Sequence, residues 1–394
     1  MDLKRELPDW IEAWLQYMFS TESPTIYHKW VAVSMIASVL ERKVFLNWDK
    51  KIYPNFYIVL VGPPAARKGT AMWPGRELLD NMNVKIAADA TTREKLIRRL
   101  KDASDTFELN GQIHSYSALT IYSEELTVFL GYGNQELMQN MADWYDCKAN
   151  WKYETKHQGI DDIDGVWVNL IGATTPGLLQ DSLPRESFGG GLNSRIIYVY
   201  ADDKEKLVLF PFAVDGRDDL QEQLNRDLSI IRLTSGEFHP DESYLKKWEE
   251  WYPNQSKDPL AQDDRLIRYI ERRPTHLHKL SIIMNASRDG GRKLTDVDFE
   301  KSLKLLKETE RKMKQAFAGI GKSSIVGIMH KVLEYVRMKG EIEYKDLMNR
   351  FYYDADDIIM SQVIATLESR KLVKFERVKV GNENNIVVYY IGET

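Results

Sequence analysis

Short apolar runs that alternate with helical stretches constrain the fold of this chain more than any other feature. Residues 56–61 read FYIVLV and end at Gly62, and similar β-rich runs occupy residues 119–123, 166–173 and 195–201. Uninterrupted apolar runs of this length are typical of strands that are buried on both faces of a parallel sheet. Because helical segments separate the runs, we expect an α/β fold in which helices cover a parallel sheet.

The length of the chain predicts more than one domain, because 394 residues exceed the usual size of a single hydrophobic core. We expect an N-terminal helical region (residues 1–45), an α/β core (46–216), a helical region (217–318) and, after a small flexible linker, a C-terminal domain (322–394). The last of these reads as three helices followed by two strands. That is the order of a winged-helix module.

Charge and cysteine content limit the classes of function. The chain has 54 Lys and Arg against 59 Asp and Glu, a net charge of -5, so any nucleic-acid contact must come from a local patch. Its one cysteine, Cys147, excludes an intrachain disulfide and indicates a reducing compartment. Without a long apolar run, we expect a cytoplasmic protein with no membrane contact.

The strongest candidate site is the segment VGPPAARKGTA, which lies between a predicted buried strand and a predicted helix. A phosphate loop needs glycine for close backbone approach, a lysine for the β and γ oxygens, and a hydroxyl for magnesium. Gly62 and Lys68 meet the first two needs, whereas Arg67 replaces a glycine and Gly69 stands at the hydroxyl position, leaving Thr70 as the substitute. The predicted nucleotide-binding loop consists of Gly62, Pro63, Pro64, Ala65, Ala66, Arg67, Lys68, Gly69 and Thr70.

The alternative for this segment is an ordinary strand-to-helix turn. A second Gly-Lys-Ser string, residues 321–323, follows a helix instead of a strand, so we interpret it as linker.

Two later strand ends carry side chains that suit a nucleotide-hydrolysing site. Glu124 and Glu125 follow the strand at 119–123, where one carboxylate would bind magnesium and its neighbour would polarise water. Thr175 follows the next strand, at the sheet edge where ligands bind in such folds. The alternatives are a Glu-rich start of a surface helix and a plain strand end.

Arg195 begins the strand at 195–201, directly after a glycine-rich loop. This position predicts an arginine finger, which would stabilise the charge on a transferring phosphoryl group. A surface arginine at a strand start is the alternative.

Residues 143–159 interleave basic and aromatic side chains. Cations that meet phosphates and rings that meet bases suit a hairpin that contacts single-stranded DNA. An exposed hairpin that packs its aromatic side chains on the neighbouring helices is an equal alternative. The predicted contacts are Lys148, Trp151, Lys152, Lys156 and His157.

The order of these parts resembles the AAA+ ATPases of the superfamily 3 and MCM-like type, especially phage and mobile-element replicative DNA helicases. The resemblance rests on GPPAARKGT as Walker A, IYSEE as Walker B, ATTP as sensor 1, and LNSRIIYVY as the arginine-finger segment. ERRPTHLHKLSIIMNAS followed by LTDVDFEKSLKLL resembles the helical lid with its sensor 2 arginine. It covers roughly residues 56–314 together with the winged-helix tail.

The resemblance implies a role for each matching residue. Lys68 would bind phosphate, Glu124 magnesium, and Glu125 would be the base. Thr175 would be the sensor. Arg195 would act on the nucleotide of a neighbouring subunit, and Arg273 would be the lid arginine.

At the level of the whole protein, the resemblance implies a ring-forming helicase or translocase that uses ATP and Mg²⁺. It would be a homo-hexamer with single-stranded DNA in its channel, duplex DNA at the winged helix, and a separate primase, in a bacterial cytoplasm if phage-encoded. The alternatives are a replication initiator or helicase loader whose ATP site controls assembly, and a small-molecule phosphotransferase.

Overall fold

The computed structural model describes residues 4–131, 134–155, 159–182, 191–210, 217–257, 260, 263, 266–317, 324–352, 355–380 and 383–392. The chain forms two compact units, Met1–Ala318 and Gly319–Thr394. The three regions predicted before residue 318 therefore share one unit, and both units mix helices with strands.

A mixed sheet in the order β4-β5-β8-β3-β9 forms the centre of the first unit. Its strands are β3 (Tyr57–Val61), β4 (Ser104–Leu109), β5 (Gln112–Ser123), β8 (Val166–Thr174) and β9 (Ile196–Tyr200). Strand β3 is parallel to both β8 and β9, and β5 is parallel to β8, whereas β4 pairs with β5 as an antiparallel hairpin. The parallel sheet that the apolar runs predict is present.

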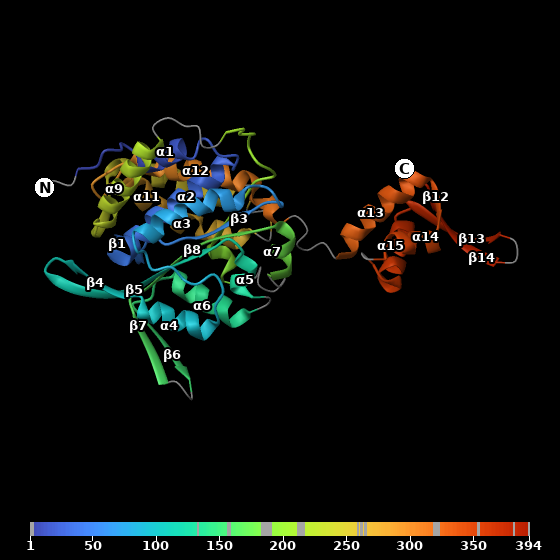
Figure 1. Ribbon diagram of the computed structural model, residues 1–394, viewed down its shortest axis with the longest axis horizontal. Helices are drawn as coiled ribbons and strands as arrows, with labels where there is room; N and C mark the ends of the chain where they lie inside the picture. Colours follow the sequence, from blue (N-terminus) through green and yellow to red (C-terminus); the bar gives the residue numbers. More distant parts are fainter. Residues whose placement is uncertain are drawn as a thin grey trace. The chain divides into compact units, whose positions relative to one another are not determined.

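Helices cover both faces of this sheet (Figure 1). The Tyr57 hydroxyl donates to the Met141 carbonyl on one face, and the neighbouring Phe56 ring packs against Trp30 on the other. Side chains that follow one another along a strand point to opposite faces, so these contacts assign α6 and α2 to opposite layers. The helices are α1 (Trp10–Tyr17), α2 (Thr25–Leu40), α3 (Lys68–Asn81), α4 (Arg93–Asp102), α5 (Leu126–Leu130), α6 (Gln135–Tyr145), α7 (Pro176–Ser182), α9 (Arg217–Arg232), α10 (Glu242–Trp251), α11 (Ile267–Ser287) and α12 (Asp296–Ala316), with 3₁₀ turns η1 (Glu41–Lys43), η2 (Asn193–Arg195) and η3 (Tyr252–Lys257).

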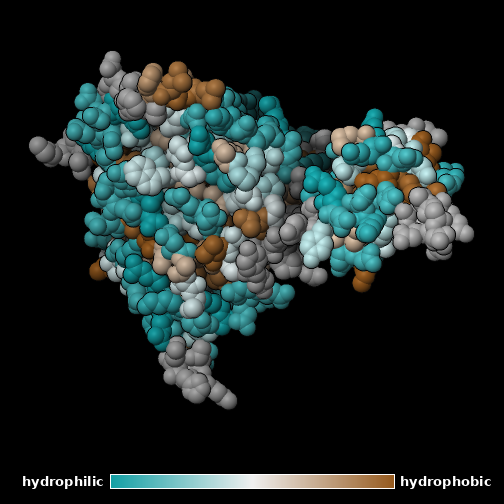
Figure 2. Space-filling model, turned by 45° about the vertical axis from the view of Figure 1, so that its right-hand side comes forward, coloured by the Kyte–Doolittle hydropathy of each residue, from teal (hydrophilic) through white to brown (hydrophobic). Residues whose placement is uncertain are grey.

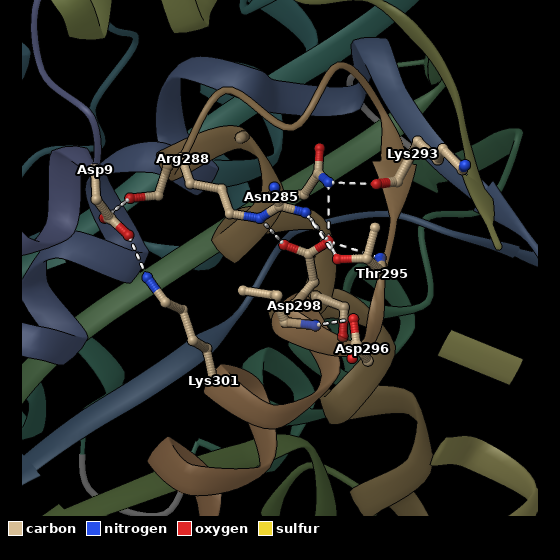
Figure 3. A network of polar contacts seen from close by, with 12 residues as sticks. Asp9, Asn285, Arg288, Lys293, Thr295, Asp296, Asp298 and Lys301 are labelled. Atoms are coloured by element: carbon tan, nitrogen blue, oxygen red, sulfur yellow. Dashed lines mark hydrogen bonds and ion pairs between the residues drawn. The ribbon is translucent and has the colours of Figure 1, made fainter. Parts of the chain in front are cut away.

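The N-terminal segment belongs to the core of this unit. Trp10, Trp14 and Trp30 are fully buried. Asp9 caps α1 and accepts hydrogen bonds from Ser287 Oγ (2.5 Å) and Lys301 Nζ (2.5 Å), which lie at the end of α11 and on α12. Figure 3 shows this polar network continuing to Asp298 and its partners. The predicted N-terminal helical region is therefore joined to the helices that follow residue 217.

A second, smaller sheet also joins the N-terminal part of the first unit to the part that follows residue 217. Its order is β11-β10-β1-β2, and β1 pairs in parallel with β10. Its strands are β1 (Val44–Asn47), β2 (Lys51–Ile52), β10 (Gly236–Pro240) and β11 (Lys293–Leu294). Segments from the beginning and the end of the first unit therefore share one sheet.

The C-terminal unit has the predicted order of three helices and a β-hairpin, with one additional short strand. Its elements are α13 (Ser324–Lys339), β12 (Glu341–Glu343), α14 (Tyr344–Arg350), α15 (Asp357–Ser369), β13 (Val373–Val380) and β14 (Glu383–Tyr390). Strand β12 adds to the hairpin in the order β12-β14-β13. A separate hydrophobic core that includes Val332, Val363 and Leu367 holds this unit together.

In neither unit does a helix of the described residues combine the length and apolar character that crossing a bilayer requires.

Candidate functional site

The candidate site lies at the edge of the central sheet where the parallel strands β3, β5 and β8 end. The loop at residues 62–67 leaves β3 at this edge and leads into α3, which begins at Lys68. Val61 pairs with Thr174 at the end of β8, and Ser123 at the end of β5 pairs with Gly172. Ligands of open α/β sheets bind outside the carboxyl ends of the strands, which is where these segments meet.

Position 62 requires glycine because two neighbouring groups approach its backbone closely. A Cβ at this position would lie 2.5 Å from the Tyr27 hydroxyl and 2.7 Å from the Ala201 carbonyl oxygen. The same Tyr27 hydroxyl donates to the Val61 carbonyl at 2.7 Å. The start of the loop is therefore fixed by α2, which the sequence pattern did not reveal.

Lys68 folds back over the loop. Its Nζ donates to the carbonyl oxygens of Gly62 (2.8 Å) and Pro63 (2.9 Å). Partial burial lowers the pKa of Lys68, and the negative charge of Glu125 opposes this shift. The ammonium group thus lies at the loop, where a phosphate-binding lysine would have to stand.

Arg67, which replaces a glycine of the usual pattern, has a backbone conformation that glycine adopts readily. Its φ is +58°, in the left-handed region that most residues avoid, and Ala65 also has a positive φ of 71°. The Arg67 side chain turns to Glu22 (2.7 Å), and the Ser23 hydroxyl donates to the Arg67 carbonyl (2.8 Å). The segment before α2 therefore supports the unusual conformation. Pro63, Pro64 and Ala66 complete the loop.

Gly69 and Glu124 lie against each other. A Cβ at position 69 would come 3.1 Å from Oε2 of Glu124, so a serine or threonine there would make this carboxylate shift by a few tenths of an ångström. Thr70 is exposed, and its Cβ points about 100° around the helix from that of residue 69. Glu124 is therefore a candidate oxygen ligand beside the loop, and the role of Thr70 as a substitute hydroxyl stays a prediction.

The acidic pair supplies two exposed carboxylates at the end of β5. Partial burial, reinforced by the charges of Asp89 and Glu125, raises the pKa of Glu124, while Arg76 opposes the shift. Within the described part of the chain, no group of three or more His, Cys, Asp or Glu side chains is placed to hold a metal alone. Mg²⁺ is commonly held by one or two carboxylates together with substrate phosphates and water, and Glu124 beside the loop fits that pattern.

Thr175 lies immediately after β8, at the same sheet edge. Its Oγ1 accepts a hydrogen bond from the Leu178 N–H (3.3 Å) at the start of α7, and the preceding Thr174 carbonyl accepts from the Gly62 N–H (3.4 Å). Thr175 therefore adjoins the loop and also caps a helix.

Arg195 lies at the opposite edge of the sheet, because it precedes the first residue of β9, which pairs with the first residue of β3. It is buried and forms an ion pair with Asp146, which also contacts Arg272 (3.4 Å). It therefore does not reach the phosphate loop of its own chain.

Arg273 is 1% exposed and forms an ion pair with the buried Glu310 of α12. This placement corrects the prediction of a nucleotide-facing lid arginine. An arginine in an amphipathic helix can form a buried ion pair or contact a ligand, and the sequence pattern is the same in both cases.

A hairpin is present where the DNA contact was predicted, and the two predicted lysines that the structure describes, Lys148 and Lys152, each form an ion pair. Strand β6 (Asn150–Thr155) pairs with β7 (Gly159–Asp164), and the register places Asp162 opposite Lys152 at 2.9 Å. Lys148 pairs with Asp143 (3.0 Å), and Trp151 is 9% exposed.

Trp151 packs edge-on against Trp144 of α6, so the alternative in which the aromatic side chains pack on the helices describes this hairpin better. Lys156 and His157 lie outside the described residues. The acidic run at residues 161–164 was the sequence signal that could have predicted the neutralisation.

The exposed face of α15 in the C-terminal unit carries little positive charge. Its exposed residues include Asp357, Ile358, Ser361 and Gln362, and Asp356 caps its N-terminus. In DNA-binding helix-turn-helix domains the N-terminal residues of the corresponding helix contact bases. Carboxylates at that end oppose the approach of phosphates.

No protein-family model matches the chain, and no curated protein matches it in sequence.

Proposed function

We propose that the chain is an AAA+ type ATP hydrolase that acts on DNA, as a ring-forming helicase or translocase. The convergence of Lys68 with the acidic pair at one loop carries this proposal. Lys68 lies within the loop, and Glu124 contacts Gly69 from the end of a different strand. Phosphate-loop enzymes need this combination of a loop lysine and a nearby carboxylate.

In the proposed reaction, Lys68 would contact the β and γ phosphates of ATP, and Glu124 would hold Mg²⁺. Glu125 would orient water and take its proton as the water oxygen attacks the γ phosphorus, while the bond from the γ phosphorus to the bridging oxygen breaks and ADP leaves with that oxygen. The metal ion would supply positive charge to the phosphate oxygens. Thr175 adjoins the loop and would contact the γ phosphate.

The proposal places ATP between subunits of a homo-hexamer, with Arg195 acting on the nucleotide of the next copy. Exposed apolar side chains near the loop support an interface there. Leu207 and Leu209 are 76% and 86% exposed, and the adjacent Val208 N–H donates to Glu22, the same carboxylate that pairs with Arg67. Figure 2 shows hydrophobic residues at several places on one otherwise mostly hydrophilic face.

A second candidate function is a replication initiator or helicase loader whose ATP site controls assembly. The neutralised hairpin favours it, because Lys152 and Lys148 are ion-paired and offer a strand little net positive charge. Such a protein would bind DNA and hydrolyse ATP slowly without separating strands.

One experiment separates the two functions. ATP hydrolysis is measured with and without single-stranded DNA, together with strand displacement on a forked duplex. Stimulated hydrolysis with displacement supports the helicase, DNA binding without displacement supports the initiator, and the absence of ATP hydrolysis and ATP binding contradicts both.

A further inference from the structure

A pocket of about 460 Å³ opens at the base of two hairpins of the first unit. Its wall combines the β1–β2 turn, the β4–β5 hairpin and the segment that joins α6 to β6. The two hairpins, β4–β5 and β6–β7, project from the body of the unit (Figure 1). The volume falls within the roughly 300–1,000 Å³ of small-ligand sites, and the pocket lies apart from the phosphate loop.

Three cations line this pocket: Arg42, Lys50 and Lys51. The Nη1 atom of Arg42 donates to the carbonyl oxygens of Cys147 (2.7 Å) and Val166 (2.8 Å), which fixes the guanidinium in place. Among the residues that the structure describes, none of the three cations forms an ion pair with a carboxylate.

Asp146 also lines the pocket, but its charge is already satisfied. Burial raises the pKa of this carboxyl, but Arg195 and Arg272, which both contact it, and the charge of Lys50 together hold the pKa below its ordinary value. The pocket therefore keeps a net positive charge, in contrast to the β6–β7 hairpin.

Aromatic rings form the other part of the wall. Phe107 and His114 face each other across the β4–β5 hairpin with ring centroids 5.4 Å apart, and His114 is exposed. Buried rings of Phe45 and Tyr53 lie among the other lining residues. Bases stack on such rings with little regard to sequence, and nearby cations meet the phosphates.

We propose that this pocket binds one nucleotide unit of a single nucleic-acid strand. Its phosphate would lie between Arg42, Lys50 and Lys51, and its base would stack on Phe107 and His114. This inference rests on the proposed action on DNA. It assigns the strand contact to cations that lack a carboxylate partner, although Arg42 and Lys51 also lie over the rings of Tyr53 and Phe45, instead of to the ion-paired lysines of the β6–β7 hairpin.

The test is binding of fluorescein-labelled oligo(dT) to the full chain, measured by anisotropy over a range of salt concentrations. The double variant Lys50→Glu, Lys51→Glu should weaken binding at least about tenfold and reduce the slope of log Kd against log salt by about 1 to 2. Phe107→Leu, which keeps an apolar side chain but removes the ring, should weaken binding at least about fivefold.

The matched control is Lys95→Glu with Lys246→Glu, two exposed lysines outside the pocket, which changes the net charge by the same amount. Equal affinity of the pocket variant and the control variant, or no binding of oligo(dT) by the unchanged chain, would overturn the inference. Binding of a fluorescent ATP analogue is measured in parallel and should be unaffected by Lys50→Glu, Lys51→Glu but lost in Lys68→Ala. If Lys68→Ala keeps its ATP affinity, the proposed ATP site fails while the strand pocket still stands.

Discussion

The carboxylate of Glu124 lies against Gly69, with Oε2 3.1 Å from the position that a Cβ at residue 69 would take. The glycine at position 69 and the position of the Glu124 carboxylate are therefore linked. The hydroxyl that is missing from α3 is matched by a carboxylate from the end of β5. The pair keeps an oxygen ligand beside the loop.

This pairing predicts non-additive effects. Gly69→Ser should crowd Glu124 and Glu124→Asp should draw the carboxylate away, so each should reduce Mg²⁺-dependent ATP hydrolysis. The double variant restores a hydroxyl and makes room for it, and should recover activity by a coupling energy of at least about 1 kcal/mol. The measurement is a double-mutant cycle on kcat/KM, and strictly additive losses would contradict the linkage.

Arg195 and Asp146 lead to a prediction about assembly. Arg195→Ala should abolish hydrolysis in uniform assemblies, and mixing it with Glu125→Gln subunits should restore part of it, because some composite sites would then be intact. Asp146→Asn is the control, since it removes the partner of Arg195 but keeps the arginine charge. No recovery on mixing, in samples of normal assembly state, would contradict action on a neighbouring subunit.

The buried pair Arg273 and Glu310 should contribute to stability and not to nucleotide binding. Arg273→Ala leaves a carboxylate that is 3% exposed without this partner, which should lower the free energy of unfolding by about 3–5 kcal/mol. Chemical denaturation measures this loss, and Arg273→Met with Glu310→Met should recover much of it. A stable Arg273→Ala variant with weakened ATP binding would support the lid role instead.

His276 and His278 predict the response of stability to pH. Burial lowers the pKa of each from 6.5 to about 3, and the charges of Lys279 and nearby arginines add to the effect on His276. Below pH 6.5 these histidines bind protons in the unfolded chain but stay neutral in the folded chain. Each histidine should therefore remove about 1.4 kcal/mol of stability per pH unit as the pH falls from 6.5 toward 3.

The variant His278→Phe isolates one of these contributions. The ring of His278 lies 4.3 Å from those of both Trp48 and Trp248, so phenylalanine keeps the aromatic packing. The Tyr244 hydroxyl loses its contact with His278 but still donates to Ser281. Denaturation at pH 7 and pH 5 should show a smaller loss of stability in the variant, and an unchanged loss would refute the assignment.

The sequence predicted the strands of the central sheet well where burial on both faces makes them continuously apolar. It placed the strand that follows β4 at residues 119–123, whereas β5 begins at Gln112. The first residues of β5 are exposed and pair only with β4, so they carry no apolar pattern. The order of elements in the C-terminal unit was also predictable, because each of its short elements has a clear polar boundary.

Pairings between distant residues were not predictable. The partners of Lys152, Arg195 and Arg273 come from the opposite strand or from other helices, and local periodicity says nothing about them. The same holds for Glu22, which supports Arg67 across 45 residues of chain. The alternation of basic and aromatic residues predicted a basic hairpin. The register of β7 places Asp162 opposite Lys152, and the two side chains form an ion pair.

The most direct test of the ATP site is a paired measurement of ATP binding and hydrolysis in Lys68→Ala and Glu125→Gln. Lys322→Ala, at the other Gly-Lys-Ser string, is the matched control. We expect Lys68→Ala to lose ATP binding and Glu125→Gln to bind ATP while hydrolysing it about 10²- to 10⁴-fold more slowly. The control should behave as the unchanged chain. Undiminished hydrolysis by either site variant would contradict the account.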